Sequence, residues 1–208
     1  MIFLISNVMK VYKDYIITDK LNLDLVQLKS SCYKMKGLVD KHLPIEKLLE
    51  VNYTENEGKL SPLTTQAFEY YNVLMHGFEG FHSLYFEIQK LFRQLNQTNE
   101  NYYIQSWLNI YEKGRFVDWH DHYPPQCNAW HGFFCVDCEP SKTTYQLPDI
   151  LEPVDIVSEN NLLVLSKSNG DRHRTWPWEH HNRERITIAF DIVPSRYTGD
   201  ILNHWIPI

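Results

Sequence analysis

The sequence predicts a mainly β protein that carries helices in its N-terminal half, an α+β arrangement. Apolar residues recur at helical spacing before residue 100, and after it the pattern changes to the period of two that is typical of strands. Many short strands after a helical segment favour a β-sandwich or small barrel with helices on one face. We expect one domain over residues 1–208, with a strand and helical buttress in 1–100, the β core in 101–193 and a C-terminal extension in 194–208.

The first hundred residues contain one strong helical pattern. Residues 79–96 should form an amphipathic helix, because seven apolar residues fall on one stripe: Phe81, Leu84, Tyr85, Ile88, Leu91, Phe92 and Leu95. A shorter helix is expected over 64–75, with Ser61 or Thr64 as its cap. The apolar residues 1–9 are too few to span a bilayer and lack the features of a secretory signal, so we expect an opening strand there.

The clearest strand pattern covers residues 103–111. Its even positions are mostly aliphatic, and its odd positions are aromatic or polar: Tyr103, Gln105, Trp107, Asn109 and Tyr111. A polar-aromatic face with few charges suits the wall of a ligand pocket. Further strands are expected at 116–120, 128–136, 143–147, 162–165 and 185–193.

Composition restricts the kind of partner. The formal charge of −6 gives no electrostatic case for binding nucleic acid or an anionic membrane, so we expect the partner to be a small molecule or a peptide. Because residues 1–9 lack the features of a secretory signal, we expect a cytoplasmic protein. The sequence does not predict an oligomeric state. Cys135 and Cys138 have C-x2-C spacing and could bind zinc together with His131, but unpaired cytosolic thiols are the simpler interpretation of the four cysteines.

The histidines predict a metal site. His120 and His122 are two apart after a probable strand, and in an extended chain such side chains point to the same face. A third ligand must come from a distant segment, and His173 is favoured because it follows an apolar run and a turn. His131 could point into the pocket or lie in the core, whereas His180 and His181 are typical of a charged surface loop. His204 is a further candidate.

These residues carry a family resemblance. The pattern N-x-Y-x-x-G-x5-H-x-[D or H], followed by a distant His and then by Arg-x-Thr, resembles that of the iron(II)- and 2-oxoglutarate-dependent oxygenases. The matching residues are Asn109, Tyr111, Gly114, His120, His173, Arg185 and Thr187. The segment Arg185-Ile-Thr-Ile-Ala-Phe-Asp looks most like that of compact prolyl-hydroxylase-like members found in phages and marine bacteria. The resemblance covers about residues 101–193 and implies a double-stranded β-helix core of the jelly-roll or cupin-like type.

The resemblance also implies roles for individual residues. His120, His122 and His173 would bind Fe(II), and Arg185 with Thr187 would bind the distal carboxylate of 2-oxoglutarate. Asn109, Tyr111 and Tyr103 would line the co-substrate pocket. The expected reaction uses dioxygen to hydroxylate a peptide or a small molecule.

One position departs from the family pattern. An acidic residue is usual two positions after the first histidine, where this chain has His122, so Asp121 or Asp118 remains an alternative ligand. The spacing of Gly114, His120, His122, Gly170 and His173 also resembles the two metal motifs of cupins, some of which are three-histidine oxygenases that need no 2-oxoglutarate. That alternative leaves Arg185 and Thr187 without a role. A non-catalytic jelly roll with a structural or binding function is the third possibility.

Overall fold

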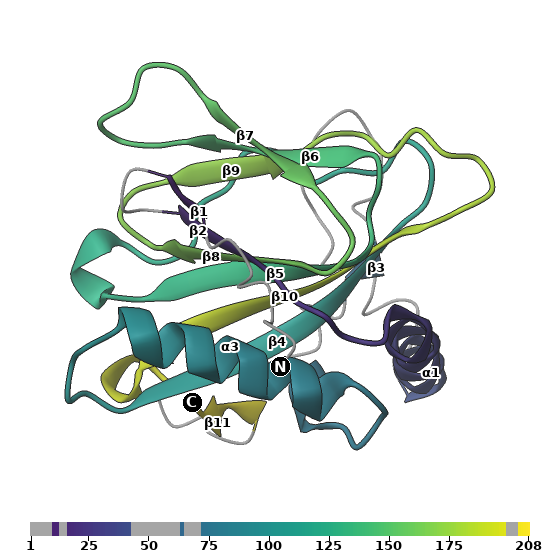
Figure 1. Cartoon of the computed structure of the whole chain (residues 1–208), viewed down its shortest axis with the longest axis horizontal. Coiled ribbons are helices and arrows are strands. Elements are labelled where there is room, and N and C mark those ends of the chain that lie inside the picture. The colour runs from purple at the N-terminus through teal and green to yellow at the C-terminus, as the bar shows by residue number, and fades with distance from the viewer. Residues whose placement is uncertain (1–9, 13–15, 43–62, 65–71, 199–203) are drawn as a thin grey trace, which may run out of the picture.

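Two β-sheets face each other, and helices cover the outer face of the larger one (Figure 1). The computed structural model describes residues 10–12, 16–42, 63–64, 72–198 and 204–208. Within these residues the larger sheet has the strand order β1-β2-β8-β5-β10-β4-β11, with β3 also paired to β4, and the smaller sheet has the order β7-β6-β9. The predicted β-rich class with N-terminal helices is therefore confirmed.

The strands of the larger sheet are β1 (Lys10–Tyr12), β2 (Ile16–Lys20), β3 (Leu63–Thr64), β4 (Tyr102–Tyr111), β5 (Trp130–Asp137), β8 (Leu162–Lys167), β10 (Arg185–Pro194) and β11 (Ile206–Pro207). Those of the smaller sheet are β6 (Ser141–Gln146), β7 (Val154–Ser158) and β9 (Arg172–Thr175). The helices are α1 (Leu25–His42) and α3 (Phe81–Leu95), with the short 3-10 turns η2 (Val73–Met75), η3 (Pro125–Cys127) and η4 (Ser195–Tyr197).

Helix α3 confirms the expected helix at 79–96, and it lies across the larger sheet on the side away from the smaller sheet (Figure 1). Five members of its apolar stripe are buried: Phe81, Leu84, Ile88, Leu91 and Phe92. They pack with Ile104, Leu108 and Ile110 of β4 in one hydrophobic cluster. Burial of this stripe against the sheet is what holds the helix in place.

Strand β4 separates two cores, as its alternating pattern predicts. Its apolar even positions, Tyr102, Ile104, Leu108 and Ile110, are buried in the cluster beneath the helices, whereas Trp107 belongs to a second cluster between the two sheets. The odd face therefore looks into the space between the sheets. The strand positions its polar and aromatic residues there because successive side chains alternate between faces.

Strand β10 lies at the centre of the larger sheet and is buried along its whole length. It pairs antiparallel with β4 on one side and β5 on the other, so that Arg185 lies opposite Tyr111, and Asp191 lies opposite His131. Arg185, Thr187 and Asp191 share the face that looks toward the smaller sheet, because they are separated by even numbers of residues. The strand thus carries all three residues on the side that lies between the two sheets.

The prediction of a helix over 64–75 is wrong at both of the ends that the structure describes. Thr64 belongs to β3, and Val73–Met75 form a 3-10 turn capped by Asn72; residues 65–71 lie outside the described part. Asn72 is buried, and its amide donates to the carbonyls of Ile104 and His204 at 2.9 and 2.8 Å. These long-range hydrogen bonds fix a turn where local spacing suggested a helix.

The strand expected at 116–120 is also wrong. This segment makes only an isolated bridge, between His120 and His173. Three residues before His120, the Val117 amide donates to the Thr175 hydroxyl at 2.8 Å. In a regular strand pair this amide would donate to a backbone carbonyl instead. The segment remains a loop held against β9.

Strands β4, β5, β6, β8 and β10 confirm the other five strand predictions within one or two residues at most ends. The expected strand at 1–9 lies outside the described residues. None of the described helices is long and apolar enough to cross a membrane.

Candidate metal centre

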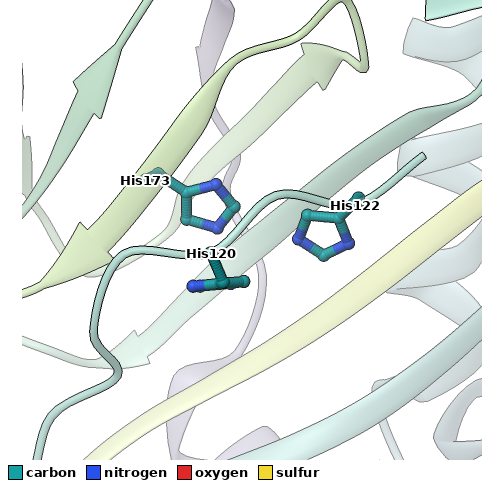
Figure 2. A group of neighbouring side chains, drawn as sticks. All are labelled: His120, His122 and His173. Carbon is teal, nitrogen blue, oxygen red and sulfur yellow. The ribbon is translucent and has the colours of Figure 1, made fainter. Parts of the chain in front are cut away.

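His120, His122 and His173 lie together between the sheets. Each offers one ring nitrogen, and these three atoms lie within 4.8 Å of one another. Figure 2 shows His120 and His122 on the loop and His173 on the neighbouring strand, β9. The two segments are joined by paired backbone hydrogen bonds, His120 N to His173 O at 3.1 Å and His173 N to His120 O at 2.9 Å. This backbone bridge thus brings histidines from distant parts of the chain within reach of one metal ion.

The outer nitrogens of the two loop histidines have partners. Nδ1 of His120 lies 2.8 Å from the carbonyl oxygen of Asp118, and Nδ1 of His122 lies 2.8 Å from Oδ1 of Asp191. A ring nitrogen that donates to an oxygen leaves the other nitrogen with its lone pair available for a metal. In both rings Nε2 is thus the nitrogen that is available to a metal ion.

The acidic alternatives lie outside this cluster. Asp121 is exposed to solvent, and the neighbouring Asp118 uses Oδ1 to accept from the Trp119 amide at 2.8 Å. His122, rather than Asp121, lies beside His120 and His173. In an extended segment, side chains two residues apart point to the same side, so His122 shares the side of His120.

Burial keeps most of these imidazoles neutral. It lowers the pKa of His120 to about 4, assisted by the nearby His122, and it lowers the pKa of His173 well below its ordinary value. Burial also opposes protonation of His122, but the carboxylate of Asp191 outweighs it, so the pKa of His122 is raised. The Asp191 charge therefore acts on this ligand more strongly than on the other two.

Arg185 lies on the same face of β10 as Asp191, the partner of His122, with only 1% of its surface exposed. Its Nε donates to Oγ of Ser141 at 3.1 Å, and its guanidinium lies 5.3 Å from the ring centre of Tyr111. Among the residues that the structure describes, no carboxylate lies within ion-pair distance of it. A buried cation without an acidic partner is costly, so its environment suits an anionic ligand.

The other predicted pocket residues divide into two groups. Thr187 is buried between Asn109 of β4 and Cys135 of β5, two residues from Arg185 on the same face. Tyr103 pairs with Val193 at the other end of β4, eight residues from Tyr111, which is roughly 26 Å along a strand. The structure brings Arg185, Thr187, Asn109 and Tyr111 together and leaves Tyr103 apart from them.

Tyr145 is a site residue that the sequence reasoning missed. Its ring stacks on that of His173 with centres 5.0 Å apart, and its buried hydroxyl has no hydrogen-bond partner among the described residues. Burial raises the pKa of this phenol, so it keeps its proton. The alternation along 143–147 was the available signal, since it places Thr143 and Tyr145 on one face.

The remaining histidine candidates lie elsewhere. His180 packs on Trp178 and His181 contacts Lys113, whereas His204 is buried near the C-terminus. The four cysteines are free, and no cysteine belongs to either group of possible metal ligands found in the described ranges.

Comparison with solved structures places this fold among known oxygenases. A prolyl-4-hydroxylase from Pseudomonas putida matches with a TM-score of 0.57 and 13% identity, over 86% of this chain and 91% of that one. The α-ketoglutarate-dependent non-haem epimerase SnoN of nogalamycin biosynthesis matches at 0.59 and 10%, over 87% and 77%. A viral collagen prolyl hydroxylase from Paramecium bursaria Chlorella virus-1, solved with 2-oxoglutarate, matches at 0.53 and 11%, over 86% and 96%.

The chain spans 59% of the length of another match, an oxidoreductase of the 2OG-Fe(II) oxygenase family from Burkholderia pseudomallei. No family model matches the sequence, and no curated protein matches it. The structural likenesses confirm, at the level of the fold, the resemblance to iron(II)- and 2-oxoglutarate-dependent oxygenases. The narrower likeness to members from phages and marine bacteria stays a prediction.

Proposed function

We propose that this protein is an iron(II)- and 2-oxoglutarate-dependent dioxygenase that hydroxylates a peptide or a small molecule. In this proposal the two sheets are those of a double-stranded β-helix, and the space between them is the active site. The fold shared with oxygenases, the histidine cluster and the buried Arg185 support it. We also propose that the protein works in the cytoplasm.

The residues present fit a bound iron(II) ion. His120, His122 and His173 offer three imidazole nitrogens within reach of one ion, and imidazole is a suitable ligand for iron(II). Three protein ligands leave further coordination positions for the co-substrate and dioxygen. Asp191 places a negative charge behind His122. This charge partly replaces the negative charge that a carboxylate ligand would have supplied.

The observation that carries the proposal is the unpaired guanidinium of Arg185. An arginine can bind a carboxylate through two parallel hydrogen bonds, which a lysine cannot reproduce. Thr187 adds a hydroxyl on the same face of β10, and the free hydroxyl of Tyr145 lies beside His173. These donors match a dicarboxylate that extends from the metal toward Arg185.

The protein's own contribution is binding, orientation and exclusion of water. Iron, when bound with 2-oxoglutarate and dioxygen, would supply the redox chemistry that couples decarboxylation to oxidation of the substrate. His120, His122 and His173 would hold the ion on one side, and Arg185 would fix the far end of the co-substrate. Burial of Arg185 strengthens its attraction for a carboxylate, because little water screens the charge.

Peptide and small-molecule substrates are both represented among the structural neighbours. Two of those neighbours are prolyl hydroxylases, and SnoN is an epimerase. The aromatic residues Trp119 and Trp176 flank the metal-bearing segments and could contact either kind of substrate. We propose hydroxylation as the reaction on the basis of the first two neighbours.

The proposal is tested by calorimetric titration of the cobalt(II)-loaded protein with 2-oxoglutarate. We expect one binding event per chain that weakens strongly in Arg185→Ala, while Arg183→Ala leaves it unchanged. Arg183 is the matched control because it lies near Arg185 in the sequence and has its own carboxylate, Asp137, at 3.6 Å. Metal binding without 2-oxoglutarate binding would instead favour the three-histidine cupin-type oxygenase, and absence of both would favour a non-catalytic jelly roll.

A further inference from the structure

A second group of possible metal ligands lies beside the first and shares one residue with it. His131, Asp171 and His173 are all buried, and one ligand atom of each lies within 4.8 Å of the other two. The rings of His131 and His173 are nearly parallel, with centres 4.9 Å apart. None of the roles proposed above requires His131 or Asp171.

We propose that His131, Asp171 and His173 form a second position for a divalent transition-metal ion. Two imidazoles and one carboxylate are a donor set that zinc, iron(II) and cobalt(II) accept. The position would be deeper than the one formed by His120, His122 and His173, since all three of its ligands are buried whereas His120 and His122 are partly exposed.

The spacing of His131 and Asp171 suits two ligands of one ion. Nε2 of His131 lies 3.2 Å from Oδ2 of Asp171, so an ion between the two atoms would replace their direct contact. Adjacent ligands bound to one ion at about 2.1 Å are themselves roughly 3.0–3.5 Å apart. The two atoms are therefore close enough to share an ion between them.

Neighbouring side chains and backbone groups hold these candidate ligands in place by hydrogen bonds to the atoms that face away from the ion. The hydroxyl of Ser168 lies 3.1 Å from Nδ1 of His131, and when Nδ1–H donates to it the other ring nitrogen is left for a metal. Asp171 accepts hydrogen bonds from the hydroxyl of Ser166 at 3.2 Å and from the backbone amide of Asn169 at 3.3 Å. Such partners orient metal ligands and are often as important as the ligands themselves.

His173 completes the group. Its Nδ1 is buried and has no hydrogen-bond partner within the described residues, which is unfavourable unless a ligand satisfies it. A neutral imidazole presents only one lone pair, so His173 can serve one ion at a time. The two positions should therefore be occupied alternately, and an ion in the deeper one would occupy His173 without the two loop ligands.

Cobalt(II) titration of four variants tests this inference, with bound metal counted by elemental analysis and its ligand field read from the visible spectrum. We expect one equivalent in the wild type and in Asp171→Asn. We also expect one equivalent, with a different spectrum, in the double variant His120→Ala/His122→Ala. Adding Asp171→Asn to that double variant should weaken cobalt(II) binding by more than about 100-fold.

The matched control adds Asp155→Asn to the double variant instead, because Asp155 is a surface carboxylate paired with Lys142. This change should leave cobalt(II) binding intact. A folded double variant that binds no cobalt(II) would overturn the inference, as would binding that Asp171→Asn leaves unchanged. Both outcomes are independent of 2-oxoglutarate, so they are distinguishable from failure of the proposed function.

Discussion

Nδ1 of His122 lies 2.8 Å from Oδ1 of Asp191, and this contact ties the loop that carries His120 and His122 to strand β10. The same face of β10 carries Arg185 six residues earlier, so one strand supports both the candidate metal centre and the candidate co-substrate site. Asp191 is buried and places a negative charge behind a neutral ligand. In the proposed site this carboxylate would supply, from behind the imidazole ring, part of the negative charge that His122 does not supply.

Asp191→Asn should lower iron(II) affinity by about 10- to 100-fold, because an amide cannot polarise the His122 ring as a carboxylate does. The affinity is measured by competition with a coloured chelator under anaerobic conditions. Asp155→Asn serves as the control for loss of one carboxylate at the surface. Equal affinities in all three proteins would show that Asp191 does not support a metal ligand.

Arg185→Lys should retain the metal and weaken 2-oxoglutarate binding by roughly 10- to 100-fold. Lysine keeps the charge but loses the paired hydrogen bonds, and hydrogen bonds to charged groups contribute about 1.5–3 kcal/mol. Arg183→Lys is the control, since Arg183 already pairs with Asp137. An unchanged dissociation constant for 2-oxoglutarate in Arg185→Lys would remove Arg185 from the proposed site.

His173→Ala should abolish both iron retention and turnover, because His173 belongs to both groups of possible ligands. Iron content after desalting and succinate formation measure the two effects. His180→Ala is the matched control, as His180 packs on Trp178 outside the cluster. An active His173→Ala variant would contradict the assignment.

The metal-free protein should lose thermal stability as the pH falls below 6.5. Burial lowers the pKa of His120 from its ordinary value of 6.5 to about 4, and it also lowers the pKa of His173. Between pH 6.5 and 4 the unfolded chain therefore binds more protons than the folded one, and protonation favours unfolding. The raised pKa of His122 acts in the opposite direction and reduces the net slope.

Melting temperatures measured from pH 8 to about pH 4.5 in the presence of a chelator check this dependence. His120→Gln should flatten the curve below pH 6.5, since it removes one group whose pKa differs between the folded and unfolded states. Parallel curves for the two proteins would refute the contribution of His120.

Gly132→Ala should destabilise the protein by about 1–3 kcal/mol. A methyl group at this position of β5 would overlap the carbonyl oxygen of Val164 and lie 2.6 Å from the ring of Phe190. The Val164 backbone belongs to the neighbouring strand β8 and cannot move without disturbing the sheet. Gly37→Ala is the control, because the added methyl group meets no atom within 4 Å. Similar unfolding midpoints for the two variants would argue against close packing around Gly132.

Local periodicity was sufficient to predict α3 and the long strands. In α3 the apolar residues form a continuous stripe, and in β4 they alternate, so each pattern has one dominant interpretation. The inner face of α1 includes Ser31 and Cys32, and its outer face includes Val26, so the contrast between faces is weak and the helix was not predicted. The helix is identified instead by Asp24, which caps it by accepting from the Val26 and Gln27 amides.

Short spacings in the sequence predicted the histidine cluster, because His120 and His122 are neighbours on one face. Asp171, Asp191 and Tyr145 were not assigned to the site, since their partners are brought together by strand pairing between distant segments. Asp191 lies at the end of the quoted Arg185 segment, but nothing in that segment shows that it contacts His122. The residues that contact the candidate ligands were therefore found only in the structure, whereas several of the candidate ligands were predicted from the sequence.

Anaerobic titration of the iron(II)-loaded protein with 2-oxoglutarate tests the central proposal most directly. We expect a weak visible metal-to-ligand charge-transfer band to appear and to saturate at one equivalent, because the open positions on the metal would accept the co-substrate as a chelate. In Arg185→Ala the band should require much more 2-oxoglutarate. Iron(II) binding to the wild type with no such band at any 2-oxoglutarate concentration would contradict the proposed function.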